Sequence, residues 1–316
     1  MENKPEKAPL LEVRDLSLHF ETGSRKKTIV KAVDNVSFNI KEAETFGLVG
    51  ESGCGKTTMG RTIIRIYNPT AGSILYEGND ISGKMNHALR RYLTDNIAMI
   101  FQDPVESLNP RMTIEEIIGE GLKVRGISDK EEIKSRVYEM LKKVGLMKEH
   151  ASRYPHEFSG GQRQRIGIAR AIVVNPKMII ADEPVSALDV SIQAQVINLL
   201  NDLKSDLGLT IMFIAHNLSV VKYFSDRIGV MYYGRMVEIA RSDDLYSNPL
   251  HPYTRSLISA IPKLNPFYRK DSRIIYDPEK DHDYSIEEPS LIEIEPEHYV
   301  YCSPSEAGRY KAGLNK

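Results

Sequence analysis

The feature that constrains this chain most is the glycine-rich segment GESGCGKT, which matches the pattern G-x-x-x-x-G-K-[ST]. The apolar run Phe46–Val49 leads directly into it, and helical periodicity follows it as far as Asn68. Glycines between a strand and a helix let backbone N–H groups curl around phosphate oxygens. An accidental glycine-rich turn is the alternative, but it does not explain the flanking strand and helix. The sequence therefore predicts a phosphate-binding loop formed by Gly50, Glu51, Ser52, Gly53, Cys54, Gly55, Lys56, Thr57 and Thr58.

The chemistry of such a loop assigns roles to its last residues. We expect Lys56 to reach the β- and γ-phosphates of ATP and the Thr57 hydroxyl to bind Mg²⁺. A second apolar run, residues 178–181, ends in Asp182 and Glu183. Unpaired carboxylates at the end of a buried strand are costly, so packing alone does not explain these two acids. The alternative to a functional role is that they form a solvent-exposed acidic turn. We expect Asp182 to bind Mg²⁺ and Glu183 to polarise the attacking water.

Composition excludes several classes of protein. The chain has 42 Lys and Arg residues against 43 Asp and Glu residues, so its net charge of −1 argues against a nucleic-acid partner. No apolar stretch approaches the ~20 residues that span a bilayer, and the N-terminus lacks the apolar core of a signal peptide. Two cysteines, Cys54 and Cys302, cannot build a disulfide framework. We expect a chain that meets a membrane only through partner proteins.

Hydrophobic periodicity indicates the fold class. Residues 11–20 alternate as a strand does, and the apolar runs 178–181 and 210–215 flank an amphipathic helical pattern from Ile192 to Leu207. Strand, helix and strand with short connections favour a parallel sheet with crossover helices. We therefore expect an α/β fold with a P-loop nucleotide-binding core, a mostly parallel sheet and antiparallel strands near the N-terminus.

Changes in composition and periodicity along the chain suggest four parts. The stretch 86–160 is more polar and mostly helical, and Ser128 with Glu131 fits a capping box. After about residue 245, prolines interrupt any long element, which predicts short elements and a loose tail. The expected division is a nucleotide-binding core over 1–85 and 161–245, a helical subdomain over 86–160 and a C-terminal appendage over 246–316.

The segment FSGGQ, at residues 158–162, completes a set of motifs. Together with the phosphate loop and the two acids, it resembles the signature motif LSGGQ of the nucleotide-binding subunits of ATP-binding-cassette (ABC) transporters. The physical reading agrees, because Ser159 is a good N-cap and the glycines expose backbone amides before a helix. The resemblance implies that the signature of one subunit faces the ATP held by another subunit. Its residues are Ser159, Gly160, Gly161 and Gln162.

Further residues match the same family. Gln102 resembles the Q-loop glutamine, which contacts Mg²⁺ or the water and senses the membrane subunit, and His216 resembles the switch histidine that contacts the γ-phosphate. Phe20 stands where the family has the aromatic residue that stacks on adenine. A lone histidine is more often structural, and an aromatic residue that ends a strand is often plain core. The D-loop, which lies across the dimer interface in the family, corresponds to Ser186, Ala187, Leu188 and Asp189.

Two stretches narrow the resemblance. Gln102–Pro104 with residues 107–113, and the C-terminal NPLHPYT at residues 248–254, are similar to the oligopeptide/dipeptide/nickel importer subfamily. The phosphate loop with Gly60 and Arg61, together with residues 107–112, looks more like the F-type of the subfamily's two ATPases. The resemblance implies an ATPase at the cytoplasmic face of the membrane, bound peripherally. Its partners would be a second ABC ATPase subunit, with a heterodimer favoured, two permease subunits and, indirectly, an extracytoplasmic solute-binding protein.

One departure from the subfamily concerns its cysteines. Many relatives carry several C-terminal cysteines, some associated with an iron–sulfur cluster, but Cys302 alone cannot supply four thiolates, so no cluster is expected. Cys54 lies inside the phosphate loop, where it either fits as a small residue or has a pKa lowered by the positive field of the loop.

The motifs weigh against two other functions and leave one choice open. A soluble ABC ATPase of DNA repair or translation would carry a long coiled-coil insertion or two cassettes. A nucleotide-binding regulator without hydrolysis would not need Glu183 and His216 intact. Within transport the solute stays open, because relatives move peptides, nickel, glutathione or oligosaccharides.

Overall fold

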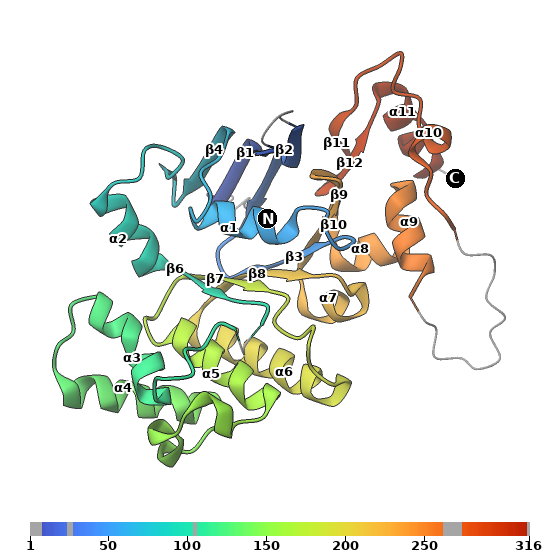
Figure 1. Cartoon of the computed structure of the whole chain (residues 1–316). Helices are drawn as coiled ribbons and strands as arrows, with labels where there is room; N and C mark the ends of the chain where they lie inside the picture. Colours follow the sequence, from blue (N-terminus) through green and yellow to red (C-terminus); the bar gives the residue numbers. More distant parts are fainter. Residues whose placement is uncertain (1–7, 24–27, 104–105, 262–273, 315–316) are drawn as a thin grey trace, which may run out of the picture. The chain divides into compact units, whose positions relative to one another are not determined.

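The computed structural model describes residues 8–23, 28–103, 106–261 and 274–314 (Figure 1). The chain divides into two compact units, and each is described by itself. The first comprises Met1–Ile40, Thr45–Ser82 and Ala215–Lys316, and the second comprises Lys41–Glu44 and Gly83–Ile214. Pro104, Pro262 and Pro266, which contributed to the sequence interpretation, lie outside the described residues.

The N-terminal part of the first unit is an antiparallel sheet of four strands. Their order is β2 (Thr28–Ile40), β1 (Leu11–Thr22), β4 (Ala71–Tyr76) and β5 (Asn79–Asp80). In β1, Leu11 pairs with Ile40 on one side and Tyr76 on the other, and all three side chains are buried. The alternation of residues 11–20 therefore predicted this strand correctly, and the antiparallel strands near the N-terminus are confirmed.

A second group of strands in the first unit leads to the phosphate loop. Its order is β11 (Ser290–Glu295), β12 (His298–Cys302), β10 (Arg235–Arg241), β9 (Arg227–Tyr232) and β3 (Thr45–Val49). Strand β3 is parallel to β9, whereas the other pairs are antiparallel. The helices of this unit are α1 (Lys56–Ile63), α7 (Leu218–Phe224), α8 (Ser242–Ser247), α9 (Pro252–Ser259), α10 (Pro278–Asp281) and α11 (Pro304–Leu314).

The expected loose tail is wrong for the C-terminal residues that the structure describes. Strands β11 and β12 form a hairpin that pairs with β10, and α11 lies beside the hairpin (Figure 1). A small core holds them together, formed by Leu250, Ile294, Val300, Cys302 and Ala307. Burial of these apolar side chains stabilises the described part of the region despite its prolines.

The second unit contains a parallel sheet and a separate set of helices. Its strands follow the order β8 (Thr210–Ala215), β7 (Met178–Asp182) and β6 (Ile97–Ile100), and β7 is buried at every residue, as expected for a parallel strand covered on both faces. The helices are α2 (His87–Asn96), α3 (Ile114–Val124), α4 (Lys130–Lys143), α5 (Gly160–Ile172) and α6 (Val190–Leu207). Two 3₁₀ turns, η1 (Lys148–Ser152) and η2 (Pro155–Glu157), precede α5.

One predicted helix cap is wrong by a residue. The side chain of Asp129, not of Ser128, accepts hydrogen bonds from Glu131 N and Glu132 N at the start of α4. Both residue types cap helices well, so the sequence alone did not separate the two neighbours. In the part of the chain that the structure describes, none of the helices is both long and apolar enough to cross a membrane.

Candidate functional site

The phosphate loop lies between β3 and α1, as the sequence predicts. The Lys56 ammonium group is almost fully buried and donates hydrogen bonds to Gly50 O and Glu51 O, both at 2.9 Å. Helix α1 begins at Lys56 after Gly55, which has φ 107°. Because the first N–H groups of a helix find no acceptor within it, the start of α1 offers donors to an anion beside a positive charge.

Two glycines of the loop are required by close packing. Gly50 has φ 153°, and a Cβ atom there would overlap Met231 O in β9. Gly55 is left-handed, and a Cβ atom there would overlap Ala32 O in β2. Since neither neighbour is a flexible side chain, another residue would displace the loop. The loop backbone is therefore held against two strands before any ligand arrives.

Cys54 does not have the lowered pKa that its place in the loop suggests. Its thiol is 6% exposed, and burial raises its pKa more than the nearby charge of Lys56 lowers it. The Lys56 ammonium group lies 3.7 Å from the sulfur. Of the two interpretations, this geometry favours a small side chain that fills the loop over an activated thiol.

The other predicted residues of the first unit are Phe20 and His216. Phe20, in β1, packs edge to face against Tyr67, with ring centroids 5.4 Å apart. Both rings are partly exposed. Tyr67 follows α1 outside any recognisable motif, so the sequence did not indicate it. His216 is exposed directly after β8, and the next residue, Asn217, caps α7.

In the second unit, the structure brings Gln102 and Glu183 together. Gln102 Nε2 donates to Glu183 Oε2 at 3.2 Å. Asp182 ends β7 with no exposed surface, and Glu183 follows it with φ 45°, a conformation that is uncommon for a residue with a side chain. Such strain is typical of functional positions. The turn separates the two acids, so one is enclosed at the strand end and the other reaches Gln102.

The D-loop is tied to Glu183 by backbone contacts. Ser186 donates to Glu183 O through its N–H and its hydroxyl, at 3.2 and 3.1 Å. Further along, Gln193 Nε2 donates to Leu188 O at 2.9 Å. A shift of the D-loop would therefore act on the residue that carries the candidate base.

The signature segment starts α5 with a complete capping box. Ser159 Oγ accepts from Gln162 N at 3.3 Å, and Gln162 Oε1 accepts from Ser159 N at 3.0 Å. A Cβ atom on Gly161 would lie 2.6 Å from Ile192 Cγ2, so this glycine lets α5 approach α6. A Cβ atom on Gly160 would lie 3.7 Å from Leu188 Cδ2, an ordinary van der Waals distance. The signature therefore lies beside the D-loop of the same unit.

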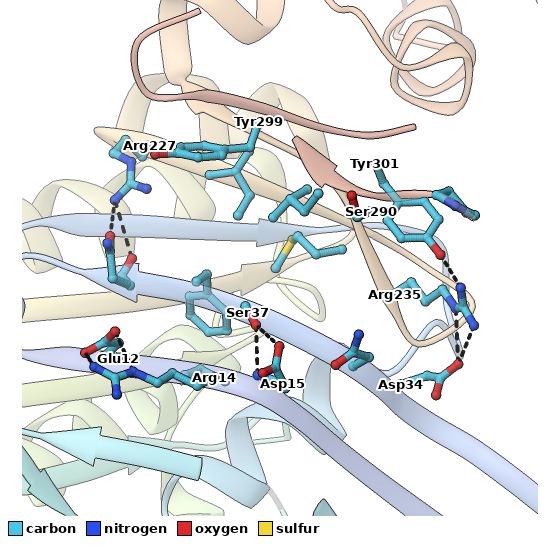
Figure 2. A pocket seen from close by; sticks show the side chains of 18 of the residues that line it. Glu12, Arg14, Asp15, Asp34, Ser37, Arg227, Arg235, Ser290, Tyr299 and Tyr301 are labelled. Carbon is cyan, nitrogen blue, oxygen red and sulfur yellow. Dashed lines mark hydrogen bonds and ion pairs between the residues drawn. The ribbon is translucent and has the colours of Figure 1, made fainter. Parts of the chain in front are cut away.

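A pocket of about 780 Å³ in the first unit contains none of the predicted site residues (Figure 2). It lies among strands β1, β2, β10, β11 and β12, and its charged groups largely neutralise one another. Arg14 binds Glu12 at 2.7 Å, and Arg235 binds Asp34 at 2.7 Å. With Arg14 and Arg235 paired to carboxylates and Arg227 hydrogen-bonded to Asn39, the pocket has less to offer a nucleotide phosphate than the loop around Lys56.

One contact of the phosphate loop was not foreseen. Glu51 N donates to the hydroxyl of Tyr253, in α9, at 3.1 Å. Tyr253 belongs to the NPLHPYT stretch, which the sequence analysis used only as a mark of the subfamily.

Comparison with protein families gives two matches that together cover much of the chain. Residues 33–186 match the model described as ABC transporter. Residues 237–285 match the model described as oligopeptide/dipeptide transporter, C-terminal region.

Curated relatives are similar over nearly the whole chain. The oligopeptide transport ATP-binding protein OppF of Bacillus subtilis is 55% identical over 94% of this chain and 97% of its own length. The oligopeptide transport ATP-binding protein AmiF of Streptococcus pneumoniae is 52% identical over 97% and 99%. The dipeptide transport ATP-binding protein DppF of Lactococcus lactis is 51% identical over 96% of each chain.

Solved structures are similar over the larger part of the chain. The ATP-binding cassette MJ0796, a dimer bound to ADP and Pi after hydrolysis, is 31% identical, with a TM-score of 0.67 over 73% of this chain and 98% of that one. The cassette cbiO1 of Clostridium perfringens, part of an ABC transporter complex, is 27% identical, with a TM-score of 0.66 over 77% and 92%.

Proposed function

The chain belongs to the ATP-binding proteins of the ABC transporter family, and from this premise we propose that it is the ATPase subunit that energises an importer of di- and oligopeptides. The observation that carries the peptide assignment is the C-terminal region, residues 237–285, which matches the region named for oligopeptide and dipeptide transporters. Named relatives at 51–55% identity, all over nearly their whole length, support the same solute class.

In the proposed mechanism, the first unit binds the nucleotide. Residues 50–58 surround the phosphates with backbone N–H groups, and Lys56 moves its charge from two carbonyls to the β- and γ-phosphates. Phe20, which is packed edge to face with Tyr67, offers a ring for adenine. His216 contacts the γ-phosphate.

The second unit supplies the hydrolytic groups. Glu183 is the base that accepts a proton from the attacking water, and Gln102 holds its carboxylate in place. The signature, Ser159–Gln162, offers its helix N-terminus to the ATP of a partner subunit, where it stabilises charge on the γ-phosphate. The D-loop, residues 186–189, links the partner interface to Glu183.

The residues fit Mg²⁺, because they supply the oxygen ligands that this ion prefers. Thr57 would hold the ion through its hydroxyl and Asp182 through its buried carboxylate. Because the amide nitrogen of Gln102 donates to Glu183, its amide oxygen would be the atom that binds the ion. A bound Mg²⁺ would neutralise charge on the phosphates.

We further propose that the subunit works in a heterodimer with a second ABC ATPase, on two permease subunits at the cytoplasmic face of the membrane. A solute-binding protein outside would deliver the peptide. The helical subdomain, residues 86–160, would receive a permease helix, with Gln102 as the link to hydrolysis. We also propose that the parts of the chain meet near residues 85, 160 and 245. The proposal includes no iron–sulfur cluster.

Peptide uptake by the assembled complex tests the proposal. The complex of this chain, its partner ATPase, the permeases and the solute-binding protein would be placed in proteoliposomes with a labelled oligopeptide. We expect uptake that depends on ATP at the cytoplasmic side and is lost with Glu183→Gln. Uptake of nickel, glutathione or an oligosaccharide, with none of peptides, would contradict the solute assignment.

A further inference from the structure

The C-terminal region reaches the phosphate loop through a polar side chain, that of Tyr253. Tyr253 is 2% exposed, so its hydroxyl is withdrawn from bulk water and directed at the backbone of Glu51, 202 residues away in the chain. A buried hydroxyl that lacked a partner would be costly, and the hydrogen bond to Glu51 N satisfies both groups. The hydroxyl therefore has a specific role at the loop, in addition to the packing of its ring.

The backbone of Glu51 is central to the loop. Its N–H donates to Tyr253, while its carbonyl accepts from Lys56 Nζ at 2.9 Å and from Cys54 N at 3.3 Å. Glu51 thus joins the C-terminal region on one side to the phosphate-binding lysine on the other. If the N–H of Glu51 lost its acceptor, the carbonyl that orients Lys56 would be less well fixed.

The position of Tyr253 is itself set by a buried polar network. Glu238, in β10, accepts from Leu250 N at 2.8 Å and His251 N at 3.0 Å, immediately before α9. The same carboxylate contacts His298 Nε2, in β12, at 2.7 Å. His251 Nδ1 then accepts from Tyr253 N at 3.1 Å, which caps α9. The start of α9 is therefore fixed to β10 and β12.

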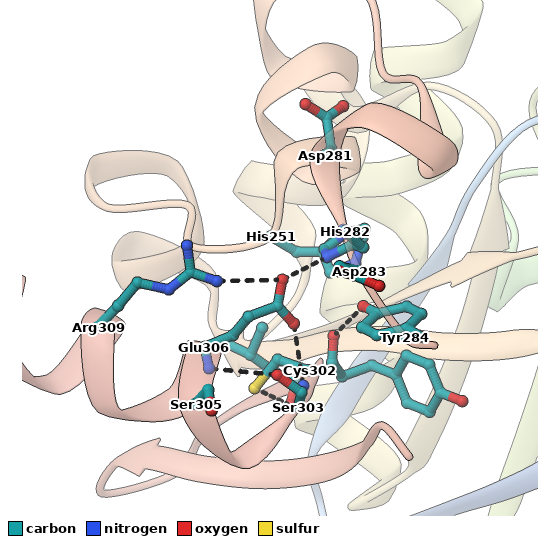
Figure 3. Close-up of polar contacts among 12 residues, drawn as sticks. His251, Asp281, His282, Asp283, Tyr284, Cys302, Ser303, Ser305, Glu306 and Arg309 are labelled. Carbon is teal, nitrogen blue, oxygen red and sulfur yellow. Dashed lines mark hydrogen bonds and ion pairs between the residues drawn. The ribbon is translucent and has the colours of Figure 1, made fainter. Parts of the chain in front are cut away.

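The network extends to the C-terminal helix (Figure 3). The ring of His251 lies 5.0 Å from that of His282, whose Nδ1 contacts Glu306 Oε1 in α11 at 2.8 Å. At the end of the network nearest the phosphate loop, the ring of Tyr253 packs against that of Tyr232, with centroids 4.4 Å apart. A continuous set of contacts therefore connects α11 with the phosphate loop.

We propose that Tyr253 is a positioning residue of the ATP site and that the C-terminal region, residues 246–316, thereby sets how firmly the phosphate loop holds ATP. The proposal rests on the proposed function, since it takes residues 50–58 as the phosphate site. Tyr253 touches no reacting atom; it acts through Glu51 on Lys56. Part of the ATP affinity is thus supplied from outside the nucleotide-binding core.

The test compares Tyr253→Phe with Tyr276→Phe in the full chain. Both remove one hydroxyl from the same ring cluster, but the described contacts of Tyr276 are with other rings and not with the loop. With Tyr253→Phe we expect the Kd and KM for MgATP to rise about fivefold, or about 1 kcal/mol, with kcat in the assembled complex changed less than twofold. Tyr276→Phe leaves both constants unchanged.

Hydrogen exchange gives a readout that does not depend on turnover. We expect faster amide exchange in the peptide that covers residues 46–58 with Tyr253→Phe, at ATP-free conditions, and unchanged exchange there with Tyr276→Phe. Equal ATP affinity and equal exchange in both variants would overturn the inference. Lys56→Ala separates this from the proposed function: if that variant keeps its ATP affinity, the phosphate site itself is wrong.

Discussion

At the scale of single residues, the proposed ATP site depends on groups whose properties come from burial. Lys56 is almost fully enclosed and holds its charge between two carbonyls, where a phosphate can replace them as its partner. Cys54 beside it is also enclosed, but it is neutral because burial raises the pKa of its thiol. The same loop therefore keeps a charged and an uncharged polar side chain 3.7 Å apart.

Alkylation of Cys54 tests this description. In a Cys302→Ala background, we expect iodoacetamide to react at pH 7 at least tenfold more slowly than with the urea-unfolded chain, because the thiolate is the reactive form and the thiol is buried. The rate should still increase above pH 9, where an ordinary cysteine levels off. A fast reaction that levels off below pH 8 would mean an activated thiol.

At the scale of elements, local patterns predicted most of the site, and long-range contacts explain the rest. Ser159 with Gln162 and the strand before Asp182 are readable because their partners lie within a few residues. The β11–β12 hairpin was missed because prolines surround it and its small core includes the distant Leu250. Tyr253 could not be assigned for the same reason, since its partner Glu51 is far away in the sequence.

His251, the N-cap of α9, is expected to make the stability of the fold depend on pH. Burial, with smaller effects from His282 and Arg255, lowers the pKa of His251 from 6.5 to about 3. Between these values the unfolded chain binds a proton that the folded chain does not, so the stability falls as the pH is lowered through this window. At about 1.4 kcal/mol per pH unit, the loss from pH 6.5 to 5 is about 2 kcal/mol.

The matched variant is His251→Asn, which keeps a side-chain acceptor for the helix start but does not titrate. Urea unfolding at both pH values measures the difference. We expect the free energy of unfolding of the wild type to fall by about 2 kcal/mol more than that of the variant. Equal losses would show that His251 is not held neutral by the fold.

At the scale of the whole molecule, each unit carries only part of the proposed ATPase site. The phosphate loop and His216 belong to the first unit, while Gln102, Asp182, Glu183 and the signature belong to the second. Binding of ATP and its hydrolysis should therefore be separable by mutation. The geometry within each unit, such as the 3.2 Å contact from Gln102 to Glu183, underlies the proposed division between ATP binding and hydrolysis.

Glu183→Gln in the assembled complex, with ATP turnover and ATP affinity measured on the same preparation, tests the central claim most directly. The amide keeps the size of the side chain but cannot accept a proton, and a positioned base contributes about 10²–10⁴-fold to the rate. We predict that turnover falls by that factor while the Kd for MgATP changes less than twofold. Unchanged turnover, or loss of ATP binding together with turnover, would contradict the account.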